Sequence, residues 1–147
     1  MIDEEINYVT LEIIPNYENI KEITFGNNVI GIGGGGFYSC TSMTTVNMHN
    51  DIQYIEFGAF VGCTSLTSIN IPINPSYTHI KSGTFMDCTS LSSITIPANI
   101  TNIDIDAFSG CTSLTSMIFK GKTLEEVQAM ENYPWQIGDT SFIKVEA

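Results

Sequence analysis

The amino-acid sequence predicts a mainly β solenoid of about five coils, each about 23 residues long, followed by a small cap that contains a helix. Three observations predict this fold. A segment that begins Cys-Thr-Ser recurs along the chain, apolar residues alternate within each copy, and a helix-start signal follows the last copy. A fixed period of this length is typical of stacked-repeat folds.

Four copies of the repeat align without gaps over their first nine residues, and they start at Cys40, Cys63, Cys88 and Cys111. The cysteines are 23, 25 and 23 positions apart, so the third unit carries two extra residues. Tyr17 lies 23 positions before Cys40 and begins a degenerate unit that keeps the apolar spacing but lacks the cysteine. The chain therefore contains five units.

Within a unit the apolar residues follow L-x-x-I-x-I, as in Leu66, Ile69 and Ile71. The alternation at the end of this pattern predicts a half-buried strand. A second apolar pair and then a phenylalanine follow in each of the first four units, and these phenylalanines are Phe37, Phe60, Phe85 and Phe108. Only two residues separate each phenylalanine from the next unit, so each coil reads as strand, turn, strand, turn. Stacked coils bury one continuous core.

The whole chain, 1–147, is expected to form one domain with a cap at each end. Residues 1–16 are expected to form the N-terminal cap, because Val9, Leu11 and Ile13 alternate before Pro15. The repeats occupy 17–120 and the C-terminal cap 121–147. Caps protect the exposed strand edges at the two ends of a stack.

A capping box is predicted at Thr123-Leu-Glu-Glu126, where a short helix would place Leu124 and Val127 on one face and end before Pro134. The only tryptophan, Trp135, then closes the core together with Ile143 and Val145.

Composition excludes several classes of protein. The chain of 147 residues is 43% hydrophobic and 14% charged, which fits a compact domain rather than a disordered one. No apolar run approaches the roughly 18 residues that a membrane-spanning helix needs, so no membrane insertion is expected. The acidic start, Met1-Ile-Asp-Glu-Glu5, predicts no signal peptide in this chain. The net charge of -11 argues against nucleic acid as a partner.

The four cysteines are predicted to form a structural ladder of buried thiols along one edge of the stack. Their spacing of more than twenty residues differs from the close pairs of zinc sites. Parallel side chains on successive coils also disfavour disulfide geometry, although neither a disulfide nor a metal is excluded. No metal site and no cofactor are expected.

Other motifs receive structural interpretations. Gly31-Ile-Gly33-Gly-Gly-Gly36 matches a dinucleotide fingerprint, but no long helix follows it, so it is interpreted as a glycine-rich turn. Asp104 and Asp106 are interpreted as solvated acidic surface. Neither His49 nor His79 has an evident nucleophile beside it in the sequence. No enzymatic activity is expected.

The x positions of L-x-x-I-x-I are predicted to point away from the core, as a flat strip of small hydroxyl and amide side chains. These residues are the candidate binding surface: Thr44, Thr45, Asn47, Thr67, Ser68, Asn70, Ser92, Ser93, Thr95, Thr115 and Ser116. Such residues also simply suit a solvated strand face. Solenoids, however, commonly use extended surfaces of this kind for binding.

The pattern A-F-x-x-C-x-x-L-x-x-I-x-I-P spans Ala59 to Pro72, and Ala107-Phe108-Ser-Gly-Cys111 repeats its first part. It resembles the BspA-type leucine-rich repeat over residues 17–120. The resemblance implies a right-handed leucine-rich solenoid with one parallel sheet and shorter strands behind it. It also implies a surface or secreted protein used in adhesion or recognition, and related repeats occur in phage-encoded proteins.

Two functional hypotheses follow. The first is a non-enzymatic recognition or adhesion module that binds a protein or glycan surface by many weak contacts. The second is a structural or assembly protein, for example a phage-encoded virion or tail component.

Overall fold

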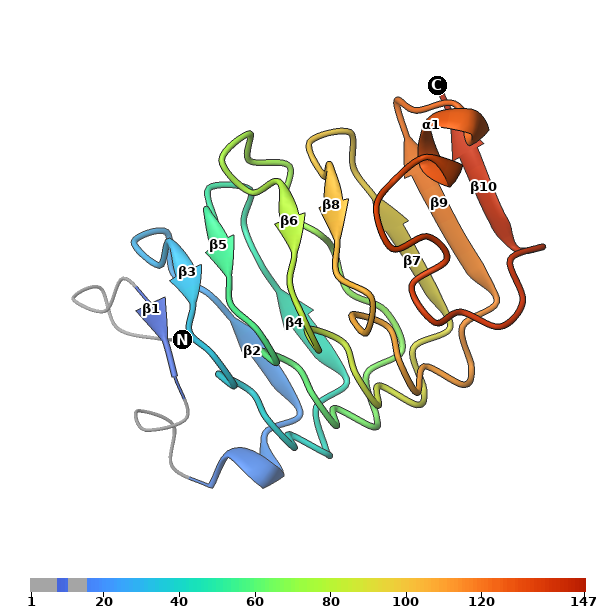
Figure 1. Ribbon diagram of the computed structural model, residues 1–147. Coiled ribbons are helices and arrows are strands. Elements are labelled where there is room, and N and C mark those ends of the chain that lie inside the picture. The colour runs from blue at the N-terminus through green and yellow to red at the C-terminus, as the bar shows by residue number, and fades with distance from the viewer. Residues whose placement is uncertain (1–7, 11–15) are drawn as a thin grey trace.

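The computed structural model describes residues 8–10 and 16–147 and shows the predicted β-solenoid of about five coils (Figure 1). We number the coils from their first residues: coil 1 is 17–39, coil 2 is 40–62, coil 3 is 63–87, coil 4 is 88–110, and coil 5 begins at 111. Two sets of strands face each other across the core, and every strand pair is parallel. Leu11, Ile13 and Pro15 of the predicted N-terminal cap lie outside the described residues.

The main sheet contains the L-x-x-I-x-I strands, which are β2 (Glu22–Thr24), β4 (Thr45–Asn47), β7 (Ser93–Ile96) and β9 (Ser116–Lys120). A strand of the C-terminal cap, β10 (Ile143–Glu146), pairs with β9. The second sheet contains shorter strands, which are β1 (Tyr8–Val9), β3 (Gly31–Ile32), β5 (Tyr54–Ile55), β6 (His79–Ile80) and β8 (Asn102–Ile103). A 3₁₀ turn, η2 (Tyr17–Asn19), opens coil 1, and the helix α1 (Leu124–Gln128) follows β9.

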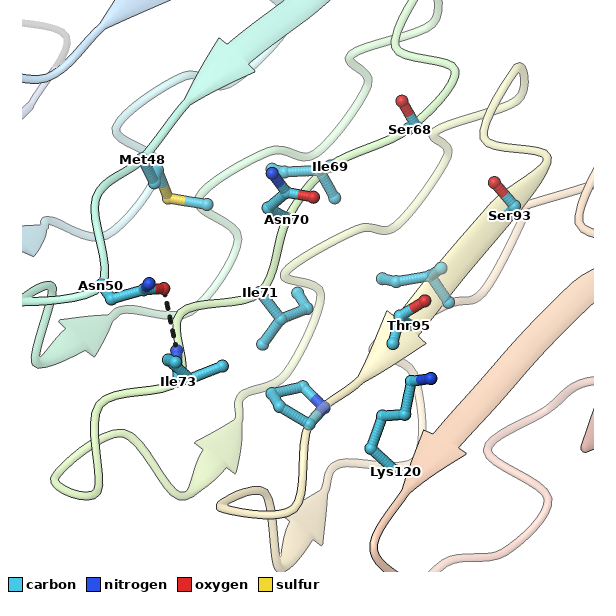
Figure 2. Close-up of a pocket in the computed structure, with 12 residues that line it drawn as sticks. Met48, Asn50, Ser68, Ile69, Asn70, Ile71, Ile73, Ser93, Thr95 and Lys120 are labelled. Atoms are coloured by element: carbon cyan, nitrogen blue, oxygen red, sulfur yellow. Dashed lines mark hydrogen bonds between the residues drawn. The ribbon is translucent and has the colours of Figure 1, made fainter. Parts of the chain in front are cut away.

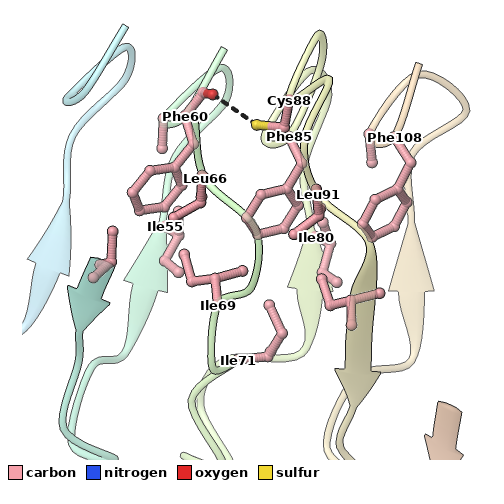
Figure 3. Close-up of a cluster of buried hydrophobic side chains, with 14 of the residues drawn as sticks. Ile55, Phe60, Leu66, Ile69, Ile71, Ile80, Phe85, Cys88, Leu91 and Phe108 are labelled. Atoms are coloured by element: carbon pink, nitrogen blue, oxygen red, sulfur yellow. Dashed lines mark hydrogen bonds between the residues drawn. The ribbon is translucent and has the colours of Figure 1, made fainter. Parts of the chain in front are cut away.

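A stack of phenylalanine rings runs through the turns that join the second sheet back to the main sheet (Figure 3). The ring centroids of Phe37, Phe60, Phe85 and Phe108 follow one another at 5.5, 5.8 and 5.5 Å, with planes within 14° of parallel. All four side chains are buried, together with the leucine and isoleucine rows beside them. The stack thus confirms that equivalent positions of successive coils lie on one another.

The same turns are joined by an unbroken series of main-chain hydrogen bonds. Phe37 N donates to Ala59 O at 2.7 Å, Phe60 N to Thr84 O at 2.9 Å, and Phe85 N to Ala107 O at 2.9 Å. This turn ladder crosses every boundary between coils 1 and 4, so it is the continuous spine of the molecule.

The two sheets, in contrast, are both interrupted between coils 2 and 3. In the second sheet β5 pairs with β3, β6 pairs with β8, and no ladder joins β5 to β6. In the main sheet β4 pairs with β2, and among the described residues no ladder joins it to coil 3. Coils 2 and 3 are therefore connected mainly through the turn ladder and their buried side chains.

The predicted strand at Leu66–Ile71 is consequently not formed as part of a ladder. One isolated bridge, between Asn70 and Thr95, connects this segment to β7. The two extra residues of coil 3 follow this segment, so they separate β5 from β6 in the second sheet but leave the spacing of 23 residues between β4 and the coil 3 segment unchanged. Within the described part of the chain, the Tyr77 hydroxyl of coil 3 is the buried side-chain polar atom without a hydrogen-bond partner.

The cysteines line the turn beside the phenylalanine stack. Cys40, Cys63 and Cys88 are buried and Cys111 is half-buried, and all four are free thiols. Three of the thiols donate through Sγ to a phenylalanine carbonyl of the neighbouring coil. The bonds are Cys63 to Phe37 at 3.2 Å, Cys88 to Phe60 at 3.1 Å and Cys111 to Phe85 at 3.0 Å. Burial raises the pKa of Cys40 to about 11 and that of Cys63 to about 12.

The C-terminal end closes the core as predicted. The capping box is present, because Thr123 Oγ1 accepts from Glu126 N while Thr123 N donates to Glu126 Oε2 at 2.7 Å. Trp135 is fully buried and stacks on Phe119 at 5.7 Å. The helix ends at Gln128, before Pro134 as expected. It differs from the expectation in its buried face, because Val127 is buried but Leu124 is 44% exposed.

In the part of the chain that the structure describes, no helix has the length and apolarity required to span a bilayer.

Replacing Phe85 by alanine is expected to lower the free energy of unfolding by about 3–5 kcal/mol, because it leaves a cavity in the middle of the ring stack. Phe57→Ala is the matched control, since Phe57 is 64% exposed, and its cost is expected to stay below about 1 kcal/mol. Urea denaturation measures both values. Equal losses in the two variants would contradict the assignment of the stack as the core.

The folded protein is expected to react slowly with a thiol-specific disulfide reagent below the ordinary thiol pKa of 9.0, because the raised pKa values leave little thiolate. Cys111 is expected to react first, since it is half-buried and lines a pocket of about 280 Å³. All four thiols should react at once in urea. A Thr64→Cys variant provides the exposed control; reaction of the four native thiols as fast as this one would contradict their burial.

Candidate functional site

The outer surface of the main sheet, here called the main face, carries the predicted strip of hydroxyl and amide side chains. Of the eleven candidate residues, ten are exposed and Ser116 is half-buried. They lie along β4, the coil 3 segment 67–70, β7 and β9, and the alternate residues of the same strands point into the core. The strip therefore spans four successive coils.

Several of these side chains are already engaged within the solenoid. Thr44 Oγ1 donates to Lys21 O at 3.1 Å, and Thr115 Oγ1 to Ser92 O at 3.4 Å. Asn47 Nδ2 donates to Glu22 Oε1 at 3.0 Å and to Thr24 Oγ1 at 3.1 Å. These contacts fasten one coil to the next, which is the structural role of a polar strand face.

Other side chains at the centre of the main face are not engaged. Ser68, Asn70, Ser93 and Thr95 make no side-chain hydrogen bond to any other residue within 8–10 and 16–147. All four lie around the segment where coil 3 fails to join the sheet. Thr67 and Ser116 are likewise unengaged, so the free hydrogen-bonding capacity of the main face extends from coil 3 to β9 and includes the interruption.

A groove of about 430 Å³ lies at the same place (Figure 2). Its polar lining includes the four free side chains together with Asn50 and Lys120, and its apolar lining includes Met48, Ile71, Ile73 and Pro97. Lys120 does not offer an unpaired charge, because its Nζ forms an ion pair with the Glu146 carboxylate. The groove is consequently an amphipathic depression without a free charge.

A second, smaller cleft of about 210 Å³ lies between β4 and coil 3. Its lining residues, Thr44–Asn47 and Thr67–Asn70, have no ionisable side chain, and it shares Ser68, Ile69 and Asn70 with the groove. Ser65 Oγ donates to Thr41 O at 2.6 Å at one end of the gap between the coils, and Ile73 N to Asn50 Oδ1 at 3.5 Å at the other. We call the groove and the cleft together the face opening.

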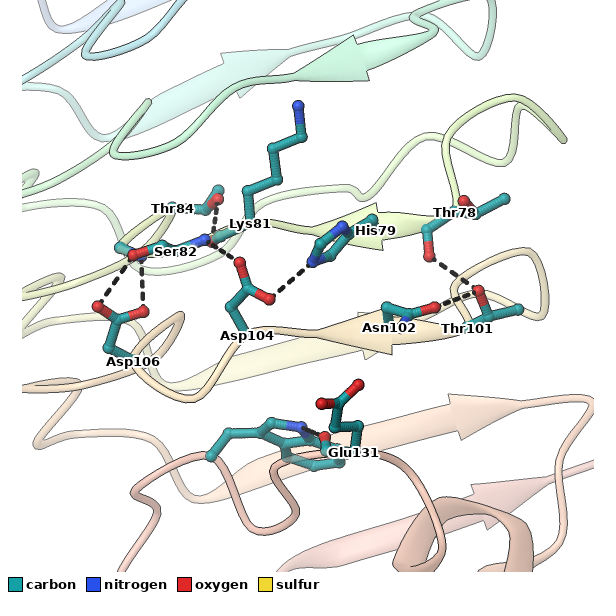
Figure 4. Close-up of polar contacts among 12 residues, drawn as sticks. Thr78, His79, Lys81, Ser82, Thr84, Thr101, Asn102, Asp104, Asp106 and Glu131 are labelled. Atoms are coloured by element: carbon teal, nitrogen blue, oxygen red, sulfur yellow. Dashed lines mark hydrogen bonds and ion pairs between the residues drawn. The ribbon is translucent and has the colours of Figure 1, made fainter.

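The acidic residues on the second sheet have a different role (Figure 4). Asp104 Oδ1 lies 2.8 Å from His79 Nε2, and Asp104 Oδ2 accepts from Ser82 N at 2.8 Å. Asp106 accepts from Ser82 Oγ at 3.0 Å and from Gly83 N at 3.1 Å. Both carboxylates therefore fasten coil 4 to coil 3 rather than serving only as solvated surface. The Ser82 hydroxyl bonds to Asp106 and not to His79, so these groups do not form a nucleophile relay.

In the described segments, no three His, Cys, Asp or Glu side chains come together around one point, so these segments contain no cluster of metal ligands.

The strip is predictable from the repeat pattern, whereas the face opening is not. The signal that was available is the spacing of 25 between Cys63 and Cys88 against 23 elsewhere. It indicated an insertion at the turn; its effect on the ladders depends on the register of the neighbouring coils, which the sequence pattern does not contain.

Comparison with known proteins bears on this fold and face. The sequence matches the family model described as a BspA type leucine rich repeat region, in six copies over residues 7–142. Among curated protein sequences, none matches this chain.

Three solved structures are similar. A leucine rich repeat protein of T. pallidum shares 28% identity and a TM-score of 0.61, over 66% of this chain and 44% of its own. A leucine rich cell surface protein of Faecalibacterium prausnitzii is 28% identical, with a TM-score of 0.55. The match covers 78% of this chain and 35% of that protein. A leucine-rich repeat protein of Bacteroides ovatus, at 21% identity and a TM-score of 0.63 over 100% and 47%, shows the shared fold alone.

The chain spans less than half the length of each of these three structures. The family model, however, covers far more than half of this chain. This protein therefore belongs to the BspA-type leucine-rich repeat family.

Proposed function

We propose that this chain is a non-enzymatic recognition or adhesion module that binds a protein or glycan surface through its main face. The observation that carries the proposal is the group of free polar side chains, Ser68, Asn70, Ser93 and Thr95, that line one groove in the middle of the main face. Polar groups without partners on a concave surface are available to a ligand at no cost to internal hydrogen bonds.

Binding by such a face relies on many weak contacts. A single hydrogen bond contributes only about 0.5–1.5 kcal/mol, so affinity requires several of them together with apolar contact. The main face extends over coils 2 to 5 and provides both at a fixed spacing, because the turn ladder joins coils 2 to 4 and the β7–β9 ladder joins coil 4 to coil 5. Linked copies of such a surface gain strength by avidity.

The polar groups elsewhere support a role without chemistry. Asp104, Asp106 and His79 hold coils together, and burial raises the pKa of the cysteine thiols, which makes them poor nucleophiles. Similarity to a leucine rich cell surface protein supports a location at the cell surface or outside the cell.

Replacing Thr67, Asn70 and Ser93 together by lysine is expected to abolish ligand capture while the melting temperature stays nearly unchanged, because all three side chains are exposed. The long charged side chains would fill and electrostatically alter the groove. Capture of surface proteins and glycans from the native source by the immobilised chain measures the effect.

The matched control places three lysines on the second sheet, at Gln53, Thr78 and Asn102, which are also exposed and give the same change in net charge. This control variant should capture ligand like the unmodified chain. Retained capture by the folded main-face variant would overturn the proposal. If both variants capture only proteins of a larger assembly, the result would favour the structural hypothesis, in which the chain is for example a virion or tail component.

A further inference from the structure

We infer that the face opening is a binding site for a neutral glycan, with sugar hydroxyls seated in the cleft between coils 2 and 3 and a sugar ring lying in the groove beside it. This inference rests on the proposed function, which leaves the ligand as a protein or a glycan. It is carried by the free groups, the absence of free charge in the lining, and the direction from which a ligand can enter.

The free groups match a ligand rich in hydroxyls. A serine or threonine hydroxyl both donates and accepts, and an asparagine amide offers two donors and a carbonyl acceptor. Ser68 and Asn70 lie in both parts of the opening, while Ser93 and Thr95 face the groove. Sugar hydroxyls also donate and accept, so every one of these side chains can find a complementary partner on one ring edge.

Main-chain groups add to this capacity. Because β4 and coil 3 share no ladder, the polar groups along the facing edges of Thr45–Asn47 and Thr67–Asn70 are not paired across the cleft. Main-chain donors and acceptors without a partner in the protein bind water or a ligand instead. Hydroxyl groups that enter from the face can replace that water.

Charge selects for an uncharged ligand. The cleft has no ionisable lining residue, and the groove's lysine is neutralised by Glu146. The chain as a whole carries a net charge of -11, which repels sialylated, sulfated or uronic sugars. No free cation is present in the lining to compensate that repulsion.

Apolar surface completes the match. Met48, Ile71, Ile73 and Pro97 give the groove an apolar lining, of which the Ile73 side chain is 59% exposed. A pyranose ring presents aliphatic C–H faces between its hydroxyls, so it can cover this surface while its edge bonds to the free amide and hydroxyls. Small-molecule sites combine apolar lining and a few polar groups in this way.

The geometry disfavours a peptide bound as an added strand. Strand addition requires an open sheet edge. Here coil 3 already lies between β4 and β7, and contacts at Ser65 and Ile73 connect it to coil 2 beyond both ends of the cleft. A ligand therefore approaches from above the main face, with side groups that point into the cleft rather than with a main chain that lies inside the sheet.

The test is a titration of the intact, ¹⁵N-labelled chain followed by two-dimensional NMR. The probes are maltopentaose, cellopentaose, mannopentaose and lacto-N-tetraose as neutral glycans, sialyllactose as an acidic glycan, and a soluble peptide of alternating valine and threonine. At least one neutral glycan at millimolar concentration should shift the amide signals of 44–47, 67–71 and 93–95, whereas sialyllactose and the peptide should not. Absence of shifts with all four neutral glycans, or shifts confined to other coils, would overturn the inference.

Variants separate the opening from the rest of the face. Asn70→Leu should weaken binding of the responding glycan about tenfold or more, because it removes hydrogen bonds and leaves the ligand's groups unpaired. Asn102→Leu makes the same substitution at an exposed position of β8 and should bind normally. If the NMR spectrum of Asn70→Leu lacks the dispersion of a folded protein, Ser68→Ala replaces it as the test variant. Weaker glycan binding by Ser68→Ala is again expected, and unchanged binding would contradict the proposed site.

The glycan site and the recognition role of the main face can be tested separately. If no neutral glycan binds but the main-face lysine variant still loses capture, the face binds a protein and the glycan inference alone is wrong. If the lysine variant retains capture, the proposed function is wrong as well.

Discussion

The fold depends on the stacking of equivalent positions one coil apart around the phenylalanine turns. A single coil cannot bury its own apolar side, so the core exists only if each phenylalanine lies on the previous one. Ring centroids 5.5–5.8 Å apart and main-chain bonds between successive turns meet this condition from Phe37 to Phe108. Other parts of the coil have more freedom. The two sheets form ladders on either side of the boundary between coils 2 and 3, and both are interrupted at that boundary.

That freedom explains the character of the main face. In the regular coils, hydroxyls such as those of Thr44 and Thr115 bond to the carbonyls of the coil before. Thr67 occupies the equivalent position of coil 3 and makes no such bond, and a groove lined by Met48, Ile71 and Pro97 lies close to this segment. The same position of the repeat therefore fastens neighbouring coils in coils 2 and 5 and is open to a ligand in coil 3.

The predictable part of the structure is the part that the period determines. Regular spacing of Leu, Ile, Phe and Cys identified the coils, the core rows and the family, and the capping box at Thr123 identified the terminal helix. The strand expected at Leu66–Ile71 is not in a ladder, because pairing depends on its neighbours as well as on its own alternation. Leu124 is exposed because the short helix buries only Val127. The face opening arises from an interruption, which a consensus pattern does not describe.

The central claim is that the solenoid is continuous through its turns and interrupted in its sheets between coils 2 and 3. Hydrogen exchange of the backbone amides, followed by NMR on the intact chain, tests it most directly, since exchange reports local opening. The account predicts rapid exchange at Ser68 and slow exchange at Ile94 and Met117, which lie in the β7–β9 ladder, with Phe60 and Phe85 protected by the turn ladder. Equal protection of Ser68 and Ile94 would contradict it.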